Sequence, residues 1–173
     1  SKYSQATMSN EIALKSIDEQ GITVNNCTFQ NIHTAIEAKN GKGGFFTMDN
    51  CEITHCLNGV VSQSIKNLLI ENSHFVMQSA IIYGQVKFNG QAINSTNANT
   101  LTINNSSVTA YGGQLILNRP AIELTNVFFT RIYESQIDNN FHGISCPYNS
   151  KNNIYASYSS ISHNNLGISM AGG

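Results

Sequence analysis

The chain has 173 residues, of which 40% are hydrophobic and 11% are charged, and its formal net charge is -1. This length can bury one core, and no apolar run approaches the roughly eighteen residues that a membrane span requires. The low charge argues against a nucleic-acid partner, because it leaves no broad basic surface for phosphates. The chain begins without an initiator Met or a signal-peptide pattern and ends within a repeat, so residues 1–173 are interpreted as one domain of a longer polypeptide.

Six short segments of similar form recur along the chain. An asparagine stands near the middle of the first four, and setting the middle residues equivalent gives spacings of 24, 22, 33, 29 and 24 residues. Periods in the twenties are typical of solenoids. The segments are TVNNCTF at 23–29, TMDNCEI at 47–53, LIENSHF at 69–75, TINNSSV at 102–108, RIYESQI at 131–137 and YASYSSI at 155–161.

Each repeat is expected to form three short strands. Apolar residues usually stand two and four positions before the middle residue, and a small and then a large residue follow it, as in strands with one buried face. The segment EIALK at Glu11–Lys15 matches AIEAK at Ala35–Lys39 and adds one more rung. The third strand of each repeat is expected to start about ten residues after the middle position, at Ile36, Val60, Ile82, Leu115, Ile144 and Ile168.

The middle residues of the repeats are expected to form an asparagine ladder. Asn tolerates left-handed backbone angles at a sharp corner, and its amide can hydrogen-bond to the Asn of the next coil. We expect the row to face inward, so that the sequons at Asn26 and Asn105 are chance matches, whereas Asn58 is expected in an exposed loop. Glu134 and Tyr158 interrupt the ladder. An antiparallel sandwich is the alternative, but it would not keep one phase through six repeats.

The repeats resemble those of a known superfamily. GITVNNCTF at 21–29 and KNLLIENSHF at 66–75 are similar to the repeats of right-handed parallel β-helix proteins of the pectin lyase-like superfamily. The resemblance extends from Glu11 to Met170 and implies an all-β fold, a right-handed single-stranded parallel β-helix with about six to seven coils of three short strands. Members are mostly polysaccharide lyases, glycoside hydrolases, epimerases and esterases, together with viral tailspikes. The fold alone does not settle the function.

The resemblance implies a glycan groove on the outward face of the strand that begins at Ala35. Polar groups and a Tyr on this face suit sugar hydroxyls, although an ordinary solvent-facing sheet is the alternative. The insertions at 84–100 and 118–127 are expected to follow this strand and to wall the groove, through Asn89, Asn94 and Glu123 among others. The predicted substrate-binding residues are Lys15, Glu37, Lys39, Gln63, Tyr83, Gln85, Lys87, Asn118 and Arg119.

One acidic constellation is a candidate for catalysis. Asp49 and Glu71 are equivalent positions on neighbouring coils, as are Glu52 and His74. Two carboxylates about 5 Å apart can divide into an acid and a nucleophile, and the His could supply a proton. Exposed side chains that splay into water are the alternative.

The four cysteines are expected to be thiols that fill the core at Cys27, Cys51, Cys56 and Cys146, because stacked parallel strands oppose the disulfide dihedral. Paired zinc-ligand spacings are not found in the sequence, so no metal and no cofactor are expected. The scattered histidines are assigned no role.

The favoured function is polysaccharide or oligosaccharide binding by an extracellular, cell-surface or virion protein, as a binding surface or as part of a polysaccharide lyase or glycoside hydrolase. The alternative is a purely structural shaft or adhesin stalk. Flanking chain or sister subunits, including a homotrimer, are expected to cover the open parallel edges at the ends of the solenoid. Neither nucleic acid nor a membrane span is expected.

Overall fold

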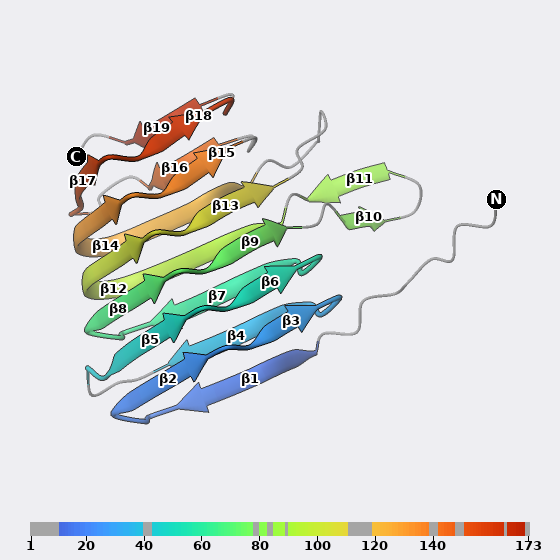
Figure 1. The fold of residues 1–173 in the computed structure, drawn as a ribbon, viewed down its shortest axis with the longest axis vertical. Coiled ribbons are helices and arrows are strands. Elements are labelled where there is room, and N and C mark those ends of the chain that lie inside the picture. The colour runs from blue at the N-terminus through green and yellow to red at the C-terminus, as the bar shows by residue number, and fades with distance from the viewer. Residues whose placement is uncertain are drawn as a thin grey trace.

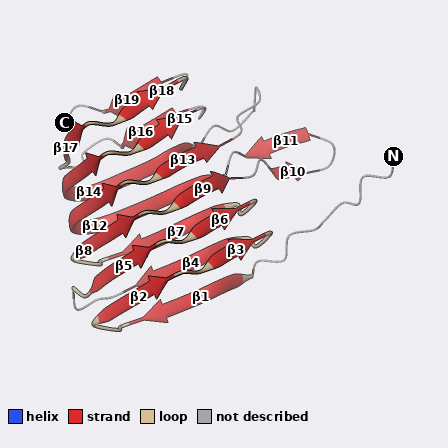
Figure 2. Ribbon diagram, in the orientation of Figure 1, coloured by secondary structure: helices blue, strands red, loops and turns tan. Residues whose placement is uncertain are grey.

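A computed structural model describes residues 11–39, 43–77, 80–82, 85–88, 90–110, 119–138, 142–147, 151–164 and 166–171. Every regular element in these ranges is a β-strand, and successive turns of the chain stack on one another from the N-terminal to the C-terminal end (Figures 1 and 2). The strands are β1 Ile12–Ile17, β2 Gly21–Asn25, β3 Thr28–Gln30, β4 Thr34–Lys39, β5 Phe45–Asp49, β6 Glu52–Thr54, β7 Asn58–Gln63, β8 Asn67–Glu71, β9 His74–Met77, β10 Ala80–Ile82, β11 Gln85–Phe88, β12 Gln91–Asn104, β13 Ser107–Ala110, β14 Pro120–Tyr133, β15 Gln136–Asp138, β16 His142–Cys146, β17 Asn153–Ser157, β18 Ser160–Ser162 and β19 Leu166–Met170.

Apart from β10 and β11, the strands form three parallel stacks, in which each strand pairs with its equivalent one coil further along the chain. Sheet I contains β1, β4, β7, β12, β14, β16 and β19 in that order, sheet II contains β2, β5, β8, β12, β14 and β17, and sheet III contains β3, β6, β9, β13, β15 and β18. This arrangement is an all-β parallel solenoid, which confirms the predicted fold class.

The register confirms the predicted phase of the strands before the corner. Val24 pairs with Met48, Met48 with Ile70, Ile70 with Ile103, and Ile103 with Ile132. Side chains in a strand alternate between its two faces, so these equivalent residues form one inward row.

Two strands are much longer than the sequence predicts. β12 and β14 each have 14 residues and run from sheet I into sheet II without a break. Both pass through a residue with positive φ, Asn97 at 56° and Asn126 at 55°, which turns the strand between the two sheets. The Asn126 side-chain amide donates to the Asn97 amide oxygen at 3.1 Å, so a second asparagine pair supports this corner.

The predicted corner between sheets II and III is present in every coil. We call its six residues the Asn corner: all have positive φ, from 43° to 55°. Asn50 donates to Asn26 at 2.6 Å, and Asn105 donates to Asn72 at 2.7 Å. Asn72 donates instead to the carboxylate of Asp49 at 2.7 Å, so the ladder changes partner between the second and third coils. The Asn corner consists of Asn26, Asn50, Asn72, Asn105, Glu134 and Tyr158.

The expectation that this row faces inward is wrong. The side chains of all four asparagines are exposed. The inward place belongs to the next residue, which is Cys51 in the second coil and Ser73 in the third, and both are buried. The amides therefore bond to one another on the outer surface rather than within the core.

The serines that follow the corner form a ladder of their own. The Ser73 hydroxyl accepts the backbone N–H of Cys51 at 3.1 Å and donates to the carbonyl of Glu71 at 2.6 Å. Ser106 and Ser135 repeat both bonds one and two coils further along the chain. A small hydroxyl at this position satisfies backbone groups that the sharp corner would otherwise leave unpaired inside the molecule.

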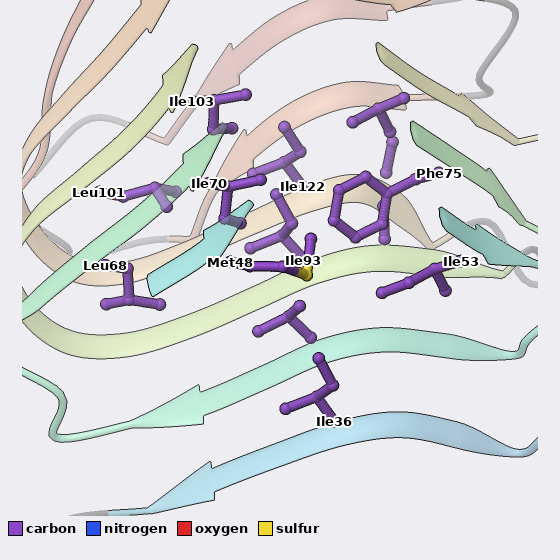
Figure 3. Packing of buried hydrophobic residues seen from close by; sticks show 14 of the residues in the cluster. Ile36, Met48, Ile53, Leu68, Ile70, Phe75, Ile93, Leu101, Ile103 and Ile122 are labelled. Carbon is purple, nitrogen blue, oxygen red and sulfur yellow. The ribbon is translucent and has the colours of Figure 1, made fainter. Parts of the chain in front are cut away.

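The core is a narrow column between the three sheets. Met48, Ile70, Phe75, Ile93 and Ile122 are fully buried and come from all three of them (Figure 3). Burial of such side chains stabilises the fold by about 1.5–3 kcal/mol each.

The predicted position of the third strand is wrong in the third coil. Val60 pairs with Ile93, not with Ile82, and Ile93 in turn pairs with Ile122. Ile82 lies in β10, which pairs in antiparallel fashion with β11 to form a hairpin beside the stack (Figure 1). Leu115, the position predicted for the fourth coil, lies outside the described residues, and Ile122 takes its expected place.

Consequently residues 91–100 and 120–127, which were predicted to be parts of insertions after the sheet I strands, belong to the strands β12 and β14 themselves. An apolar triplet such as Ala80–Ile82 has the composition of a core strand, and only pairing with β7 distinguishes it from the true strand at Gln91.

The inward side chains of the last described coil are more exposed to solvent than those of the preceding coil. Ile168 is 45% exposed, whereas its register partner Ile144 is fully buried. Within the described ranges, the structure contains no helix with the length and apolar character needed to cross a membrane.

Candidate functional site

The outward face of sheet I brings together four of the predicted binding residues. Lys15 pairs with Glu37, and Lys39 pairs with Gln63, in adjacent rows across the strands. Neighbouring strands lie about 4.8 Å apart, so these side chains share one continuous surface. Further along the stack the row of Glu37 continues through Val61, Asn94, Glu123 and Ser145, and that of Gln63 continues through Thr96 and Thr125.

The lower part of this face holds an ion-pair cluster. The Lys39 ammonium lies 2.5 Å from one oxygen of Glu37, and the Lys15 ammonium lies 3.5 Å from the other. The hydrogen bond from Lys39 is the main reason that the pKa of Glu37 lies below its ordinary value of 4.5, and the charges of both lysines act in the same direction. Glu37 is therefore ionised and held in place.

A second polar network lies at the start of the sheet I strands, is organised around Arg119, and reaches the outer face through Asn94 and Glu123. Nη1 of Arg119 donates to the Asn58 side-chain oxygen at 2.8 Å, and Nη2 donates to the Gln91 side-chain oxygen at 2.7 Å. Asn58 is buried, and Gln91 is only 1% exposed. The expectation that Asn58 lies in an exposed loop is wrong, because it begins β7 beneath the Arg119 side chain.

Gln91 connects Arg119 to the strand residues of the face. Its amide nitrogen donates to Glu123 at 2.9 Å, and its oxygen also accepts from the Asn94 amide at 3.0 Å. Arg119, Asn94 and Glu123 all come from the insertions that were predicted to wall the groove, so the structure brings these three together. Sequence reasoning missed Gln91 and Asn58. The available signal was a polar residue directly before an Ala or Gly near the start of some sheet I strands, as in Asn58-Gly59 and Gln91-Ala92.

The charge of Arg119 is not neutralised by a direct carboxylate contact in the described network. Burial lowers the pKa of Arg119, while the charge of Glu123 raises it. All ten Asp and Glu residues lie within the described ranges, and Glu123 reaches Arg119 only through Gln91. A guanidinium has five N–H donors, and the two amide contacts use two of them.

The remaining predicted binding residues do not join this face as expected. Gln85 and Lys87 lie on β11, which pairs with β10 instead of joining sheet I, so their assignment to the face is wrong. Tyr83 and Asn118 lie outside the described residues.

The four weak catalytic candidates pair as predicted but do not form one group. Asp49 is the register partner of Glu71 in sheet II, and Glu52 is the partner of His74 in sheet III. Asp49 accepts from Asn72, and Glu71 accepts from the Asn104 amide at 3.1 Å. These two carboxylates are therefore engaged by amides on one side of the Asn corner.

Glu52 and His74 lie on the other side of the corner, beside a shallow hollow of about 300 Å³. The His74 ring is hydrogen-bonded to the Ser107 hydroxyl at 2.8 Å. Asp49 and Glu71 do not line this hollow, which is formed by Asn26, Cys27, Thr28, Asn50, Cys51, Glu52, Asn72 and His74.

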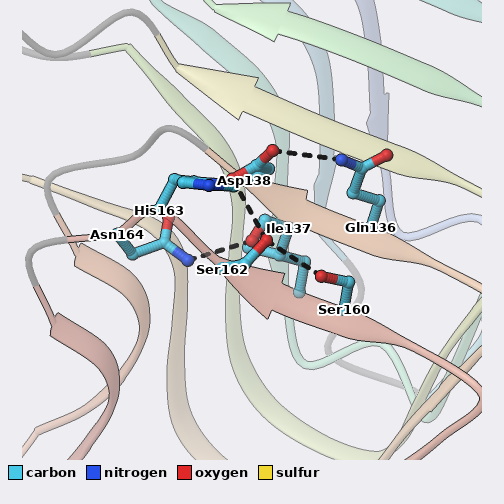
Figure 4. Close-up of polar contacts among 7 residues, drawn as sticks. All are labelled: Gln136, Ile137, Asp138, Ser160, Ser162, His163 and Asn164. Carbon is cyan, nitrogen blue, oxygen red and sulfur yellow. Dashed lines mark hydrogen bonds and ion pairs between the residues drawn. The ribbon is translucent and has the colours of Figure 1, made fainter.

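A further polar cluster ties the last two coils together near the end of sheet III (Figure 4). The buried Asp138 accepts from Gln136 at 3.1 Å and from Ser162 at 3.3 Å, and the His163 ring lies 2.9 Å from its carboxylate. Asn164 donates to the Ile137 carbonyl at 2.9 Å. The contacts of Ser162, His163 and Asn164 join one coil to the next, and His163 had no role assigned from the sequence.

The cysteines are free thiols, and Cys51, Cys56 and Cys146 are buried in the core as predicted. Burial raises the pKa of each of these three thiols. Among the described residues, no three or more His, Cys, Asp and Glu side chains group in a way that could hold a metal ion.

The stacked parallel sheets and their single core define a parallel β-helix protein. A family model described as "Right handed beta helix region" matches residues 13–173, and the chain belongs to this family. No curated protein and no solved structure matched the chain.

Proposed function

We propose that the chain binds a polysaccharide along the outer face of sheet I. The observation that supports this proposal is the Arg119 network, in which a half-buried guanidinium is held by two amide oxygens and leaves donors for a ligand. The pectin lyase-like proteins that the repeats resemble commonly use the equivalent face for glycans.

The chemistry of the face suits sugar hydroxyls. It presents amides at Gln63 and Asn94, hydroxyls at Thr96 and Thr125, and a few charged groups that are already paired or bonded. Such mixed donors and acceptors fit hydroxyl groups, which both donate and accept. The few cations favour an uncharged or weakly acidic saccharide over a densely anionic one.

The spacing of the carboxylates favours binding over hydrolysis on this face. Glu37 and Glu123 are separated by three strand spacings through Val61 and Asn94, which corresponds to about 14 Å between backbones. Glycoside hydrolases hold their two carboxyl groups about 5–9.5 Å apart. The proposed role of this face is therefore binding rather than hydrolysis. We place the protein at a cell surface or on a virion, with flanking chain or sister subunits covering the ends of the solenoid.

Glycan-array screening followed by calorimetric titration of the best polysaccharide tests this proposal. Gln63→Ala and Lys39→Ala are each expected to weaken binding about fivefold, because each removes about one net hydrogen bond. Arg131→Ala is the charge-matched control, since Arg131 lies in the sheet II part of β14. Absence of binding to every polysaccharide on the array would favour the structural shaft instead. If Arg131→Ala lost as much polysaccharide affinity as the sheet I variants, the binding surface could not be assigned to sheet I.

A further inference from the structure

The Asn corner changes its chemistry in the last two coils. Glu134 and Tyr158 keep the left-handed backbone, with φ of 47° and 51°, although neither residue type is favoured there. A left-handed residue with a Cβ is less stable by about 1–2 kcal/mol, and neither side chain offers the amide that continues the ladder. Residues held in such a conformation often mark a functional site.

These two residues line a second hollow. Its volume is about 370 Å³, and it lies along the corner next to the first hollow, with His74 shared between them. Hydroxyl, amide, imidazole and carboxylate groups surround it, which provides both donors and acceptors. The lining residues are His74, Asn105, Ser106, Ser107, Glu134, Ser135, Gln136, Tyr158 and Ser160.

Tyr158 supplies a flat apolar surface to this hollow. The residue is 84% exposed, and its ring meets the ring of Tyr133 edge-on, with centroids 5.5 Å apart and an interplanar angle of 82°. The aromatic ring is therefore oriented by a neighbour while its face remains open to solvent, which is the arrangement that a stacking ligand requires.

We propose that this hollow is a second saccharide site, which binds one uncharged pyranose ring. The apolar face of the sugar lies against Tyr158, and its hydroxyls bond to Glu134 and Gln136. The lining contains one carboxylate and neither Lys nor Arg. It therefore disfavours uronates and other anionic sugars, because an anion would meet Glu134 with no opposing cation. This site goes beyond the sheet I surface and does not depend on it.

Titration by two-dimensional NMR of the full chain tests the site with defined probes. The probes are glucose, galactose, mannose and N-acetylglucosamine at millimolar concentrations, with glucuronate as the charged counterpart of glucose. At least one neutral sugar is expected to shift the backbone signals of Asn105, Ser107, Gln136 and Ser160. Glucuronate is expected to bind about tenfold more weakly than glucose if glucose binds, and Glu134→Gln should reduce that difference.

Two tyrosines of the same coil provide matched variants. Tyr158→Asn is expected to weaken sugar binding about tenfold, through the lost stacking surface, while keeping the corner folded because Asn tolerates positive φ. Tyr155→Ala removes an exposed ring that does not line the hollow and should leave binding unchanged. Gln63→Ala, which lies on sheet I, should leave the sugar-induced shifts at the residues lining the hollow unchanged. Failure of the sheet I proposal is therefore distinguishable from failure of this second site.

Three results would overturn the proposal. The first is the absence of shifts at the lining residues with all four neutral sugars. The second is equal binding by wild type and Tyr158→Asn, or an equal loss in Tyr155→Ala. The third is a concentration-dependent dimer in sedimentation that Tyr158→Asn abolishes, which would assign this surface to contact between copies of the chain.

Discussion

The outer face of sheet I and the Asn corner are both polar surfaces of the same solenoid, but their hydrogen bonds are organised differently. At the corner, the bond from Asn50 to Asn26 recurs two ladder steps later between Asn105 and Asn72, and Asn72 bonds to Asp49 at the step between them. On the sheet I face, residues far apart in sequence converge on one side chain, Arg119, which bonds to Asn58 across 61 residues.

This difference in hydrogen bonding indicates how each surface contributes to the stability of a repeat protein. Repeated bonds each support one step of the stack, so loss of one bond has a local effect. Converging bonds share partners, so loss of one leaves other buried groups unpaired and the effects are not additive. Mutations on the two surfaces should therefore differ in size.

The largest expected effect is at the centre of the sheet I network. Asn58→Ala should lower the free energy of unfolding by about 2–3 kcal/mol, because it leaves a charged Arg119 donor without its acceptor in a buried place. Denaturant unfolding measures the change. Asn67→Ala, which removes an exposed asparagine from β8, should have an effect within about 0.5 kcal/mol. Similar small effects for both variants would show that the network contributes little.

The Asn corner should respond more weakly. Asn50→Ala should lower the free energy of unfolding by about 1–2 kcal/mol, since it removes the exposed side-chain hydrogen bond to Asn26 and places Ala at φ 50°. Asn50→Gly should recover most of the loss, because Gly tolerates that backbone without strain. Thermal unfolding of the wild type, Asn50→Ala and Asn50→Gly measures the differences in stability. An Asn50→Ala loss larger than that of Asn58→Ala would reverse the proposed ranking of the two surfaces.

The smallest expected effect concerns pH at the lower end of the sheet I face. The pKa of Glu37 is lowered in the folded state, so its contribution to stability is present above the ordinary value of 4.5 and is lost as pH falls through the folded value. Glu37→Gln should therefore reduce the loss of stability on acidification below pH 4.5. Both lysines are substantially exposed, which keeps the effect small. Identical pH profiles for wild type and variant would contradict this prediction.

The coils and their corners could be predicted from local sequence alone, because these features repeat. The positive φ at the corner follows from local preference, and the inward row from Val24 to Ile132 follows from alternation within each strand. A pattern that recurs every coil can be phased without knowledge of any contact, so the all-β solenoid and the pairing of Asp49 with Glu71 were predictable.

The features that occur once were set by contacts between coils. Ile82 and Ile93 have the same apolar character, and pairing with Val60 selects Ile93. The direction of the corner amides depends on which neighbour fills the core, and the burial of Asn58 depends on an arginine that arrives from a later insertion. These outcomes arise because each depends on a contact between particular coils, so the partners are selected by long-range packing rather than by local pattern.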